Sequence, residues 1–252
     1  MIFTSRLQPA VLIRRYKRFL ADVQLPSGEL ITVHCPNTGS MKNCINEGSA
    51  CWLSVSNNSN RKYPYTLELI TTPTEHLAWI HSQKANALVA EALCNGRIAE
   101  LVGYANIQTE VKYGDASRID FLLTKEEAEC FVEVKSVTLL DDTLPLATNK
   151  NAISLLGVGC FPDAVSLRGQ KHLRELIAVT QRGQRAVLLF CVMHNGINAV
   201  AAAKHIDSDY AALLKKAQAA GVELLVYRAA ISLDEVRLSE RLPFIPNEHT
   251  EI

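Results

Sequence analysis

A hairpin-like stretch at residues 118–135 constrains the fold of this chain more than any other segment. It holds two short, mostly apolar strand-like runs joined by a polar turn. Because side chains alternate along a strand, Glu133 and Lys135 share one face of the second run. If the turn is symmetric, Asp120 on the first run lies opposite Glu133. Sequence alone does not fix the register, so this pairing is a prediction.

Two carboxylates and one ammonium group interrupt this apolar ribbon, and such breaks in pattern are expected at functional sites. The set suits metal-assisted phosphodiester hydrolysis, in which Asp120, Glu133 and the backbone carbonyl of Val134 would hold Mg²⁺ or Mn²⁺. Lys135 would orient or deprotonate a water, or offset charge on the phosphorane. The alternative is the solvated face of a half-buried strand, because this short pattern often recurs by accident.

Composition places the chain among ordinary globular proteins. Its 252 residues, 48% hydrophobic and 21% charged, suffice for one large domain or two smaller ones. The seven cysteines include no CxxC pair, which favours free thiols in a reducing cytoplasm over a disulfide framework or a zinc ribbon. No apolar run approaches the length of a membrane span, and the N-terminus lacks a signal-peptide core. We therefore expect a cytoplasmic protein without membrane contact.

The net charge is zero, but basic residues are concentrated near the start of the chain. Residues 1–82 carry eight Lys and Arg against five Asp and Glu. The excess includes a basic run interleaved with aromatic residues, which suits a phosphate backbone and exposed bases. Its candidate DNA contacts are Arg14, Arg15, Lys17 and Arg18. The alternative for this run is a solvated strand edge or linker.

Several short strand-like runs with turn signals between them predict a small closed barrel at the start of the chain. The five-stranded oligonucleotide-binding (OB) barrel is the best match in size, and its loops usually hold the ligand. Candidate DNA contacts in these loops are Asn37, Arg61, Lys62 and Tyr63. An ordinary exposed hairpin tip is the alternative for the last three.

The pattern changes from strand-like to helical near residue 80, so we predict a barrel at 1–82 and a second domain at 83–252. From residue 83 the expected order is helix, three strands, helix, strand, helix, strand, which predicts a mixed α/β domain with its sheet between helices. On the first of these helices Glu91 could reach the metal, although a solvated carboxylate is the default. The tail beyond Leu242 is polar and is expected to be loosely held.

This order of elements, with R-I-D-F followed by E-V-K, resembles the PD-(D/E)XK nuclease superfamily. The resemblance implies that the acid, acid and lysine of its motif are Asp120, Glu133 and Lys135. It also implies that Glu91 is the additional acid from the first core helix. Polar residues on the helix after the E-x-K strand are often functional in this superfamily, which points to Gln170 and Lys171 as DNA contacts.

More of the chain resembles the sugar fermentation stimulation protein A family. The runs that carry this resemblance are R-Y-K-R-F at 15–19, H-C-P-N-T-G-S-M at 34–41, E-V-K-Y at 110–113, S-R-I-D-F at 117–121, E-V-K-S-V-T at 133–138, F-P-D-A-V at 161–165 and R-G-Q-K-H-L at 168–173. The resemblance implies a bacterial cytoplasmic protein that binds DNA without marked sequence preference and is linked to the regulation of sugar, notably maltose, utilisation. It also implies an OB barrel ahead of a nuclease-like domain. The chain departs from the family in an insertion at about residues 140–160, which could change access to the active strand.

Two functional classes therefore compete. In one, the barrel holds single- or double-stranded DNA while Asp120, Glu133 and Lys135 cut it. In the other, the protein is a non-catalytic DNA-binding regulator of sugar (maltose) metabolism genes on a nuclease-like fold. The complete D, E-x-K set favours the nuclease, because clustered carboxylates would repel DNA unless a cation intervened. A third, weaker candidate is a nucleotide or RNA processing enzyme that uses the same site.

Overall fold

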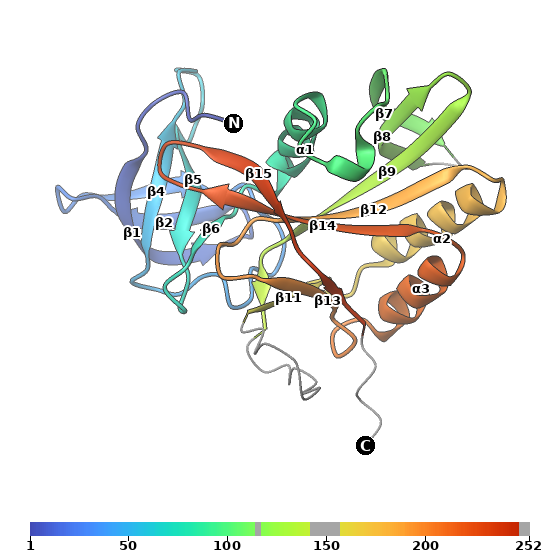
Figure 1. Ribbon diagram of the computed structural model, residues 1–252. Coiled ribbons are helices and arrows are strands. Elements are labelled where there is room, and N and C mark those ends of the chain that lie inside the picture. The colour runs from blue at the N-terminus through green and yellow to red at the C-terminus, as the bar shows by residue number, and fades with distance from the viewer. Residues whose placement is uncertain (114–116, 142–156, 247–252) are drawn as a thin grey trace.

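Two β-sheet units make up the chain, a barrel and a larger domain built on a mixed sheet (Figure 1). The structure is a computed structural model that describes residues 1–113, 117–141 and 157–246. Most of the insertion expected at 140–160 lies outside the described residues. The mixed α/β class predicted from the sequence is confirmed.

The N-terminal unit is a closed barrel. Its strands are β1 (Gln8–Tyr16), β2 (Leu20–Gln24), β3 (Leu30–His34), β4 (Ala50–Val55), β5 (Tyr65–Thr71) and β6 (Leu77–Trp79). The strand order is β3-β2-β1-β4-β5-β6, and a parallel contact between His34 of β3 and Thr66 of β5 closes the ring. The first five strands therefore enclose the barrel and β6 extends it, which confirms the predicted OB-like fold.

Alternating burial explains the register of the barrel strands. In β1, Ala10 and Leu12 are buried whereas Val11 and Ile13 are exposed, as expected for a strand with one face toward a core. The inward side chains of the barrel strands meet in one apolar cluster. A slip of one residue would turn Val11 and Ile13 inward and Ala10 and Leu12 outward, so burial holds the register.

The second unit follows the barrel without interruption. Its helical elements are η1 (Ser82–Lys84), α1 (Ala85–Cys94), η2 (Ala99–Leu101), α2 (Leu167–Gln181) and α3 (Ser208–Ala219). Its strands are β7 (Asn106–Tyr113), β8 (Ser117–Lys125), β9 (Ala128–Val137), β10 (Leu139–Leu140), β11 (Val158–Phe161), β12 (Arg185–Val192), β13 (Ala199–Ala202), β14 (Glu223–Ile231), β15 (Val236–Arg241) and β16 (Phe244–Ile245). In the part of the chain that the structure describes, no helix is long and apolar enough to cross a membrane.

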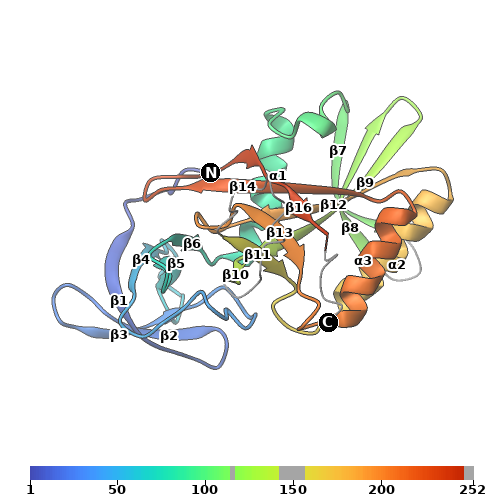
Figure 2. The same cartoon turned by 60° about the horizontal axis from the view of Figure 1, so that its bottom comes forward.

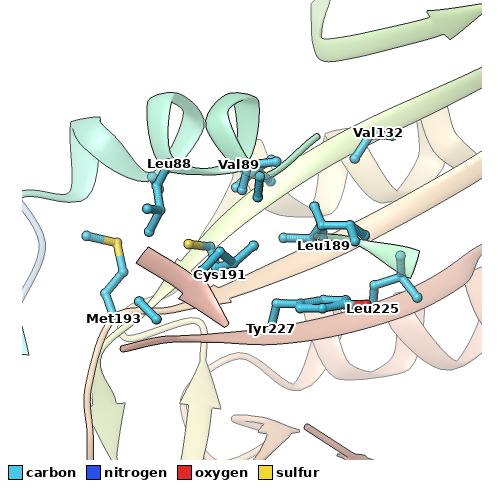
Figure 3. Packing of buried hydrophobic residues seen from close by; sticks show 14 of the residues in the cluster. Leu88, Val89, Val132, Leu189, Cys191, Met193, Leu225 and Tyr227 are labelled. Carbon is cyan, nitrogen blue, oxygen red and sulfur yellow. The ribbon is translucent and has the colours of Figure 1, made fainter. Parts of the chain in front are cut away.

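The central sheet of this unit has the strand order β15-β14-β12-β9-β8-β7. The β9, β12 and β14 strands run parallel, and the remaining neighbours are antiparallel. Helix α1 packs on one face, where Leu88 and Val89 lie over Val132, Leu189 and Cys191 (Figure 3). Helices α2 and α3 cover the other face (Figure 2). The β12 strand is buried along nearly its whole length because both faces of the sheet are covered, as its continuous apolar run predicts.

A smaller sheet, β10-β11-β13-β16, was not predicted. The β13 strand is Ala-Val-Ala-Ala, a composition with little intrinsic strand preference, so only its neighbours make it extended. The expectation of a loose tail beyond Leu242 is wrong for Phe244 and Ile245, which pair with β13.

The two units are joined by hydrogen bonds at the end of β6. The N–H of Trp79 donates to the carbonyl of Met193, and the N–H of Asn195 donates to the carbonyl of Leu77, each at 2.9 Å. Trp79 also belongs to the apolar cluster beneath α1. These contacts hold the barrel against the segment that follows β12.

Candidate active site

The predicted hairpin forms, and the candidate site lies where its two strands separate. The β8 and β9 strands pair antiparallel as far as Phe121 and Val132, so Asp120 and Glu133 are the next opposed residues, in agreement with the predicted register. Asp120 takes the place of a strand partner there, because its Oδ2 accepts the N–H of Val134 at 2.7 Å. The two backbone groups of a strand residue point to the same side, so the Val134 carbonyl faces this edge too.

Asp120 is also held from α1. Asn86 Nδ2 donates to Asp120 Oδ1 at 2.7 Å, so each carboxylate oxygen has a neutral donor. Burial raises the pKa of Asp120 and the charge of Glu133 raises it further, against the lowering effect of the bonds from Val134 and Asn86. A cation near both carboxylates would offset this repulsion and favour the charged form of Asp120.

Glu133 is almost completely buried, and its Oε1 accepts hydrogen bonds from two cationic or polar side chains. Lys135 Nζ donates at 2.6 Å, and His172 Nδ1 contacts the same oxygen. Arg168 Nε donates to His172 Nε2 at 3.4 Å, so the proton of the neutral His172 ring lies on Nδ1, facing Glu133. Burial opposes the charge of Glu133, but the hydrogen bond from His172 and the charge of Lys135 prevail and lower its pKa. Glu133 is therefore ionised at neutral pH.

The other oxygen of Glu133 fits a metal ligand. Oε2 is buried and has no hydrogen-bond partner within the described residues. Such an atom costs about 1–3 kcal/mol, and more when charged, unless a partner compensates it. Two carboxylates, from Asp120 and Glu133, and the carbonyl of Val134 offer the oxygen ligands that Mg²⁺ and Mn²⁺ prefer.

No group of three His, Cys, Asp or Glu side chains is placed to hold a metal among residues 1–113, 117–141 and 157–246. A divalent cation at this position would therefore rely on two carboxylates, a backbone carbonyl, water and a bound phosphate. Mg²⁺ is commonly bound in this way, because it keeps several waters and shares the substrate phosphate.

Two tyrosines border Glu133 and stay protonated. Burial raises the pKa of both Tyr113 and Tyr210, and the charge of Glu133 raises each further. Neither hydroxyl can act as a base at neutral pH. The side chains that contact Glu133 and can hold or move a proton are Lys135 and His172.

The structure does not bring Glu91 to this cluster. Its carboxylate pairs with the amine of Met1 at 2.7 Å and with Arg97 at 3.5 Å. Asn86, five positions earlier on α1, is the residue that contacts Asp120. Five positions correspond to about 140° around an α-helix, so the two side chains face different neighbours. Helical spacing in the sequence could have identified Asn86, but an amide is not part of the acidic pattern.

On α2 the structure separates the predicted residues from the one that reaches the site. Gln170 is buried and donates to both carboxylate oxygens of Asp207, so it is part of the internal packing. Lys171 is exposed and pairs with Glu175 at 3.7 Å. His172, which sequence reasoning did not assign, contacts Glu133. Its place in the R-G-Q-K-H-L run at 168–173 was the signal for it in the sequence.

In the basic run that ends β1, some side chains are paired within the protein and others are exposed. Arg14 pairs with Asp22 at 2.8 Å and lies over the ring of Tyr16. Lys17 and Arg18 are exposed at the turn between β1 and β2 and are open to a ligand.

Arg15 and Asn37 organise a barrel loop from within. Arg15 Nη2 donates to the carbonyls of Arg18, Asn37 and Gly39 at 2.7, 2.7 and 2.9 Å. Asn37 is buried, and its Oδ1 accepts the N–H of Gly39 at 2.8 Å. Both side chains are therefore engaged with the protein itself, which the basic pattern of the sequence could not show.

We expect Arg15→Lys to lower the free energy of unfolding by about 1–3 kcal/mol, because an ammonium group cannot reproduce the guanidinium fork that bonds several carbonyls. Arg18→Lys, at an exposed side chain of the same run, is the matched control and should change it by less than about 0.5 kcal/mol. Denaturant unfolding followed by tryptophan fluorescence measures both. Equal stabilities of the two variants would contradict the loop-organising role of Arg15.

The β4–β5 loop carries the remaining candidates. Arg61 Nη2 lies 3.2 Å from His34 Nδ1 on the neighbouring strand end. Lys62 is exposed, and its Nζ lies 5.5 Å from the centre of the Tyr63 ring, which is half-buried. This loop and the β1–β2 turn are the loops that hold ligands in OB folds.

Comparison with known proteins adds to this geometry. The family model described as "Sugar fermentation stimulation protein RE domain" matches residues 83–235, and the "SfsA N-terminal OB domain" model matches residues 13–80. A sugar fermentation stimulation protein homolog of Shewanella sp. (strain MR-7) is 56% identical over 245 residues, which cover 96% of this chain and 99% of that protein. The homolog of Teredinibacter turnerae is 54% identical over 246 residues, covering 97% of this chain and 100% of that protein.

A solved structure is similar over nearly the whole chain. It is that of Pyrococcus furiosus SfsA in complex with Ca²⁺, and its TM-score is 0.81. The two sequences are 25% identical, and the similarity covers 97% of this chain and 98% of that one. The arrangement of a barrel beside a mixed sheet is therefore shared with an experimentally determined relative.

Proposed function

Because this chain belongs to the sugar fermentation stimulation protein family, we propose that it binds DNA without marked sequence preference and cleaves its phosphodiester bonds with Mg²⁺ or Mn²⁺. The observation that carries the proposal is Glu133 Oε2, which lies near the Asp120 carboxylate and has no partner in the described part of the chain. Two adjacent carboxylates, one buried and one half-buried, would repel a polyanion, and a divalent cation would turn the same pair into a phosphate site. The complex of the Pyrococcus relative with Ca²⁺ supports this, since Ca²⁺ prefers the same hard oxygen ligands.

Each residue of the cluster has a distinct task in this proposal. A divalent cation held there would supply Lewis-acid polarisation of the phosphodiester and activation of a water. Asp120 and Glu133 supply its carboxylate ligands, and the bonds from Asn86 and Val134 keep Asp120 in place. Lys135, 2.6 Å from Glu133, offsets charge at the reacting phosphate or orients the water.

His172 is a positioning residue. It contacts the same oxygen of Glu133 as Lys135 does, and it is itself held by Arg168. A carboxylate fixed through one oxygen presents the other in a defined direction, which reduces the reorganisation needed on binding. The short E-x-K motif does not contain this residue because it comes from the helix that packs on the strand.

The test is a substrate screen with purified protein. We expect at least one DNA among single-stranded, duplex, branched and flapped forms to be cut with Mn²⁺ or Mg²⁺ present, and none to be cut with EDTA. DNA binding without cleavage of any substrate would support the alternative, a non-catalytic regulator of sugar (maltose) metabolism genes. One observation favours that alternative: Glu133 is buried, and Lys135 and His172 already pair with its Oε1, so this oxygen needs no metal ion.

The open basic residues of the barrel should set the salt dependence of DNA binding. We expect the triple variant Lys17→Ala, Arg18→Ala, Lys62→Ala to weaken binding and to reduce the slope of log K against log salt by roughly one unit per lost phosphate contact. The matched control removes three exposed lysines of the second unit, Lys204, Lys215 and Lys216, and should leave the slope close to that of the parent chain. Fluorescence anisotropy over a salt series measures the slope for each protein. Equal slopes for both triple variants would place the DNA surface elsewhere.

A further inference from the structure

A second cluster of ionisable side chains lies on the barrel, apart from the Asp120–Glu133 site. His34 ends β3, Arg61 lies in the β4–β5 loop, and His81 follows β6. They meet beside the point where His34 and Thr66 close the barrel. Behind them is Glu68 of β5, a buried carboxylate. Four separate segments therefore bring one acid and three basic groups together.

Glu68 is fully engaged by donors inside the barrel. Its Oε1 accepts Ser54 Oγ at 2.8 Å, and its Oε2 accepts Trp79 Nε1 at 2.9 Å and His81 Nδ1 at 3.0 Å. Burial opposes its charge, but the bonds from His81, Trp79 and Ser54 prevail and lower the pKa of Glu68. An ionised carboxylate only accepts, so His81 Nδ1 is the donor and the ring presents Nε2 on its other side.

His34 is fixed in the opposite tautomer. A guanidinium group has no acceptor, so Arg61 Nη2 donates to His34 Nδ1, and the proton of the neutral ring lies on Nε2. Burial lowers the pKa of His34, and the charges of Arg61 and His81 lower it further, against Glu68. His34 thus offers an N–H group without carrying a charge of its own at neutral pH.

The cluster has more donor capacity than the protein satisfies. Within the described residues, neither His34 Nε2 nor His81 Nε2 has a hydrogen-bond partner, and one Arg61 nitrogen is engaged by His34. The only carboxylate in the cluster is Glu68, whose two oxygens already accept three bonds. An incoming anion would therefore meet the Arg61 guanidinium and the Nε2–H of His34 as donors that are oriented from behind, which is the arrangement that binds phosphate oxygens. His81 Nε2 adds a third donor in the imidazolium form, because Nδ1 already donates to Glu68.

We propose that His34, Arg61 and His81 form a phosphate-binding subsite that receives a backbone phosphate of the bound nucleic acid. The assignment of the phosphate to nucleic acid rests on the proposed function, whereas the phosphate chemistry rests on this cluster alone. The subsite lies against the β4–β5 loop, where OB folds hold their ligands. It uses no metal ion, so it is separate in chemistry from the Asp120–Glu133 site.

The test follows the histidine ring C–H signals by NMR in EDTA, assigned with His34→Gln and His81→Gln. The probes are inorganic phosphate and a thymidine oligonucleotide of about ten nucleotides, within the site size of an OB fold, without a terminal phosphate. We expect both probes to shift the His34 and His81 signals. Arg61→Gln should weaken inorganic phosphate binding roughly tenfold or more, the loss expected for a charge-assisted contact. Arg182→Gln, at an exposed arginine of the second unit, is the matched control and should bind as the parent chain does.

The outcomes separate the subsite from the proposed function. His34 and His81 signals that stay unmoved by both probes would overturn the subsite, even if the oligonucleotide binds elsewhere on the chain. Shifts caused only by an oligonucleotide with a 5′-phosphate would replace the backbone phosphate by a terminal one and so contradict the assignment. Because EDTA is present throughout, failure of the chain to cleave DNA has no bearing on this measurement. Preserved chemical shifts elsewhere in the spectrum of Arg61→Gln show that this variant is folded.

Discussion

Lys135→Ala is expected to reduce metal-dependent cleavage by at least about 10²–10³-fold, the loss typical of removing one group that stabilises charge in the transition state. Lys135 Nζ lies 2.6 Å from Glu133 Oε1, so its ammonium group contacts a predicted metal ligand. DNA binding should change little, because the side chain is one charge among several basic residues. Single-turnover cleavage and anisotropy on the same DNA measure the two effects separately.

The matched controls for this prediction change a carboxylate to an amide. Asp120→Asn should abolish both cleavage and the heat of Mn²⁺ binding in calorimetry, because it removes a charged ligand. Glu91→Gln makes the same chemical change on α1, where the carboxylate pairs with Met1 and Arg97. It should cleave and bind Mn²⁺ as the parent chain does. Equal loss of cleavage in both variants would show that Glu91 belongs to the site. Mn²⁺ uptake by Asp120→Asn equal to that of the parent chain would show that the metal does not bind there.

The stability of the fold should fall as the pH drops from about 6.5 to about 4, because His194 is buried without charge. Its Nδ1 accepts the N–H of Gly196 at 3.0 Å, and its buried Nε2 has no partner within the described residues. Burial, with the nearby His76 ring adding to it, lowers the pKa of His194 to about 4. Unfolded histidine titrates near 6.5. In this interval the unfolded chain therefore binds a proton that the folded chain does not, which favours unfolding by up to about 3 kcal/mol.

The measurement is denaturant unfolding at several pH values for the parent chain and for His194→Gln. The variant lacks the titrating ring, so the difference between the two stabilities should shrink as the pH falls through this interval. His34, whose pKa is also lowered in the folded state, contributes a loss of the same sign and is common to both proteins. Carboxylates with lowered pKa lose their contribution at lower pH. Parallel curves for the two proteins would show that His194 is protonated in the folded chain.

Local pattern was sufficient where the physical cause is local. The symmetric turn between β8 and β9 predicts the register that sets Asp120 opposite Glu133. The continuous apolar run of β12 predicts a strand covered on both faces. In each case the periodicity of a single strand determines the outcome, and that periodicity is present in the sequence.

Charge pattern was a weaker guide, because residue type does not reveal what a side chain contacts. Arg15 belongs to the same basic run as Lys17, yet its guanidinium donates to three backbone carbonyls. Two of these carbonyls lie in the loop that follows β3. Gln170 and His172 are two positions apart on α2, and only His172 meets Glu133. Residues two positions apart on a helix, such as Gln170 and His172, point to different surroundings, which the packing of other elements supplies.

The sequence by itself determined the two-unit architecture, the family and the acidic pair with its lysine, since each depends on residue order within short stretches. Only the tertiary structure decided which polar groups form hydrogen bonds within the protein and which remain accessible to a ligand. It places Asn86, and not the predicted Glu91, beside Asp120, and it brings His172 to Glu133. It also assembles His34, Arg61 and His81 around Glu68. The physical reason is that hydrogen bonds and burial depend on distances between segments far apart in the chain, and these distances are set by the packing of the whole fold.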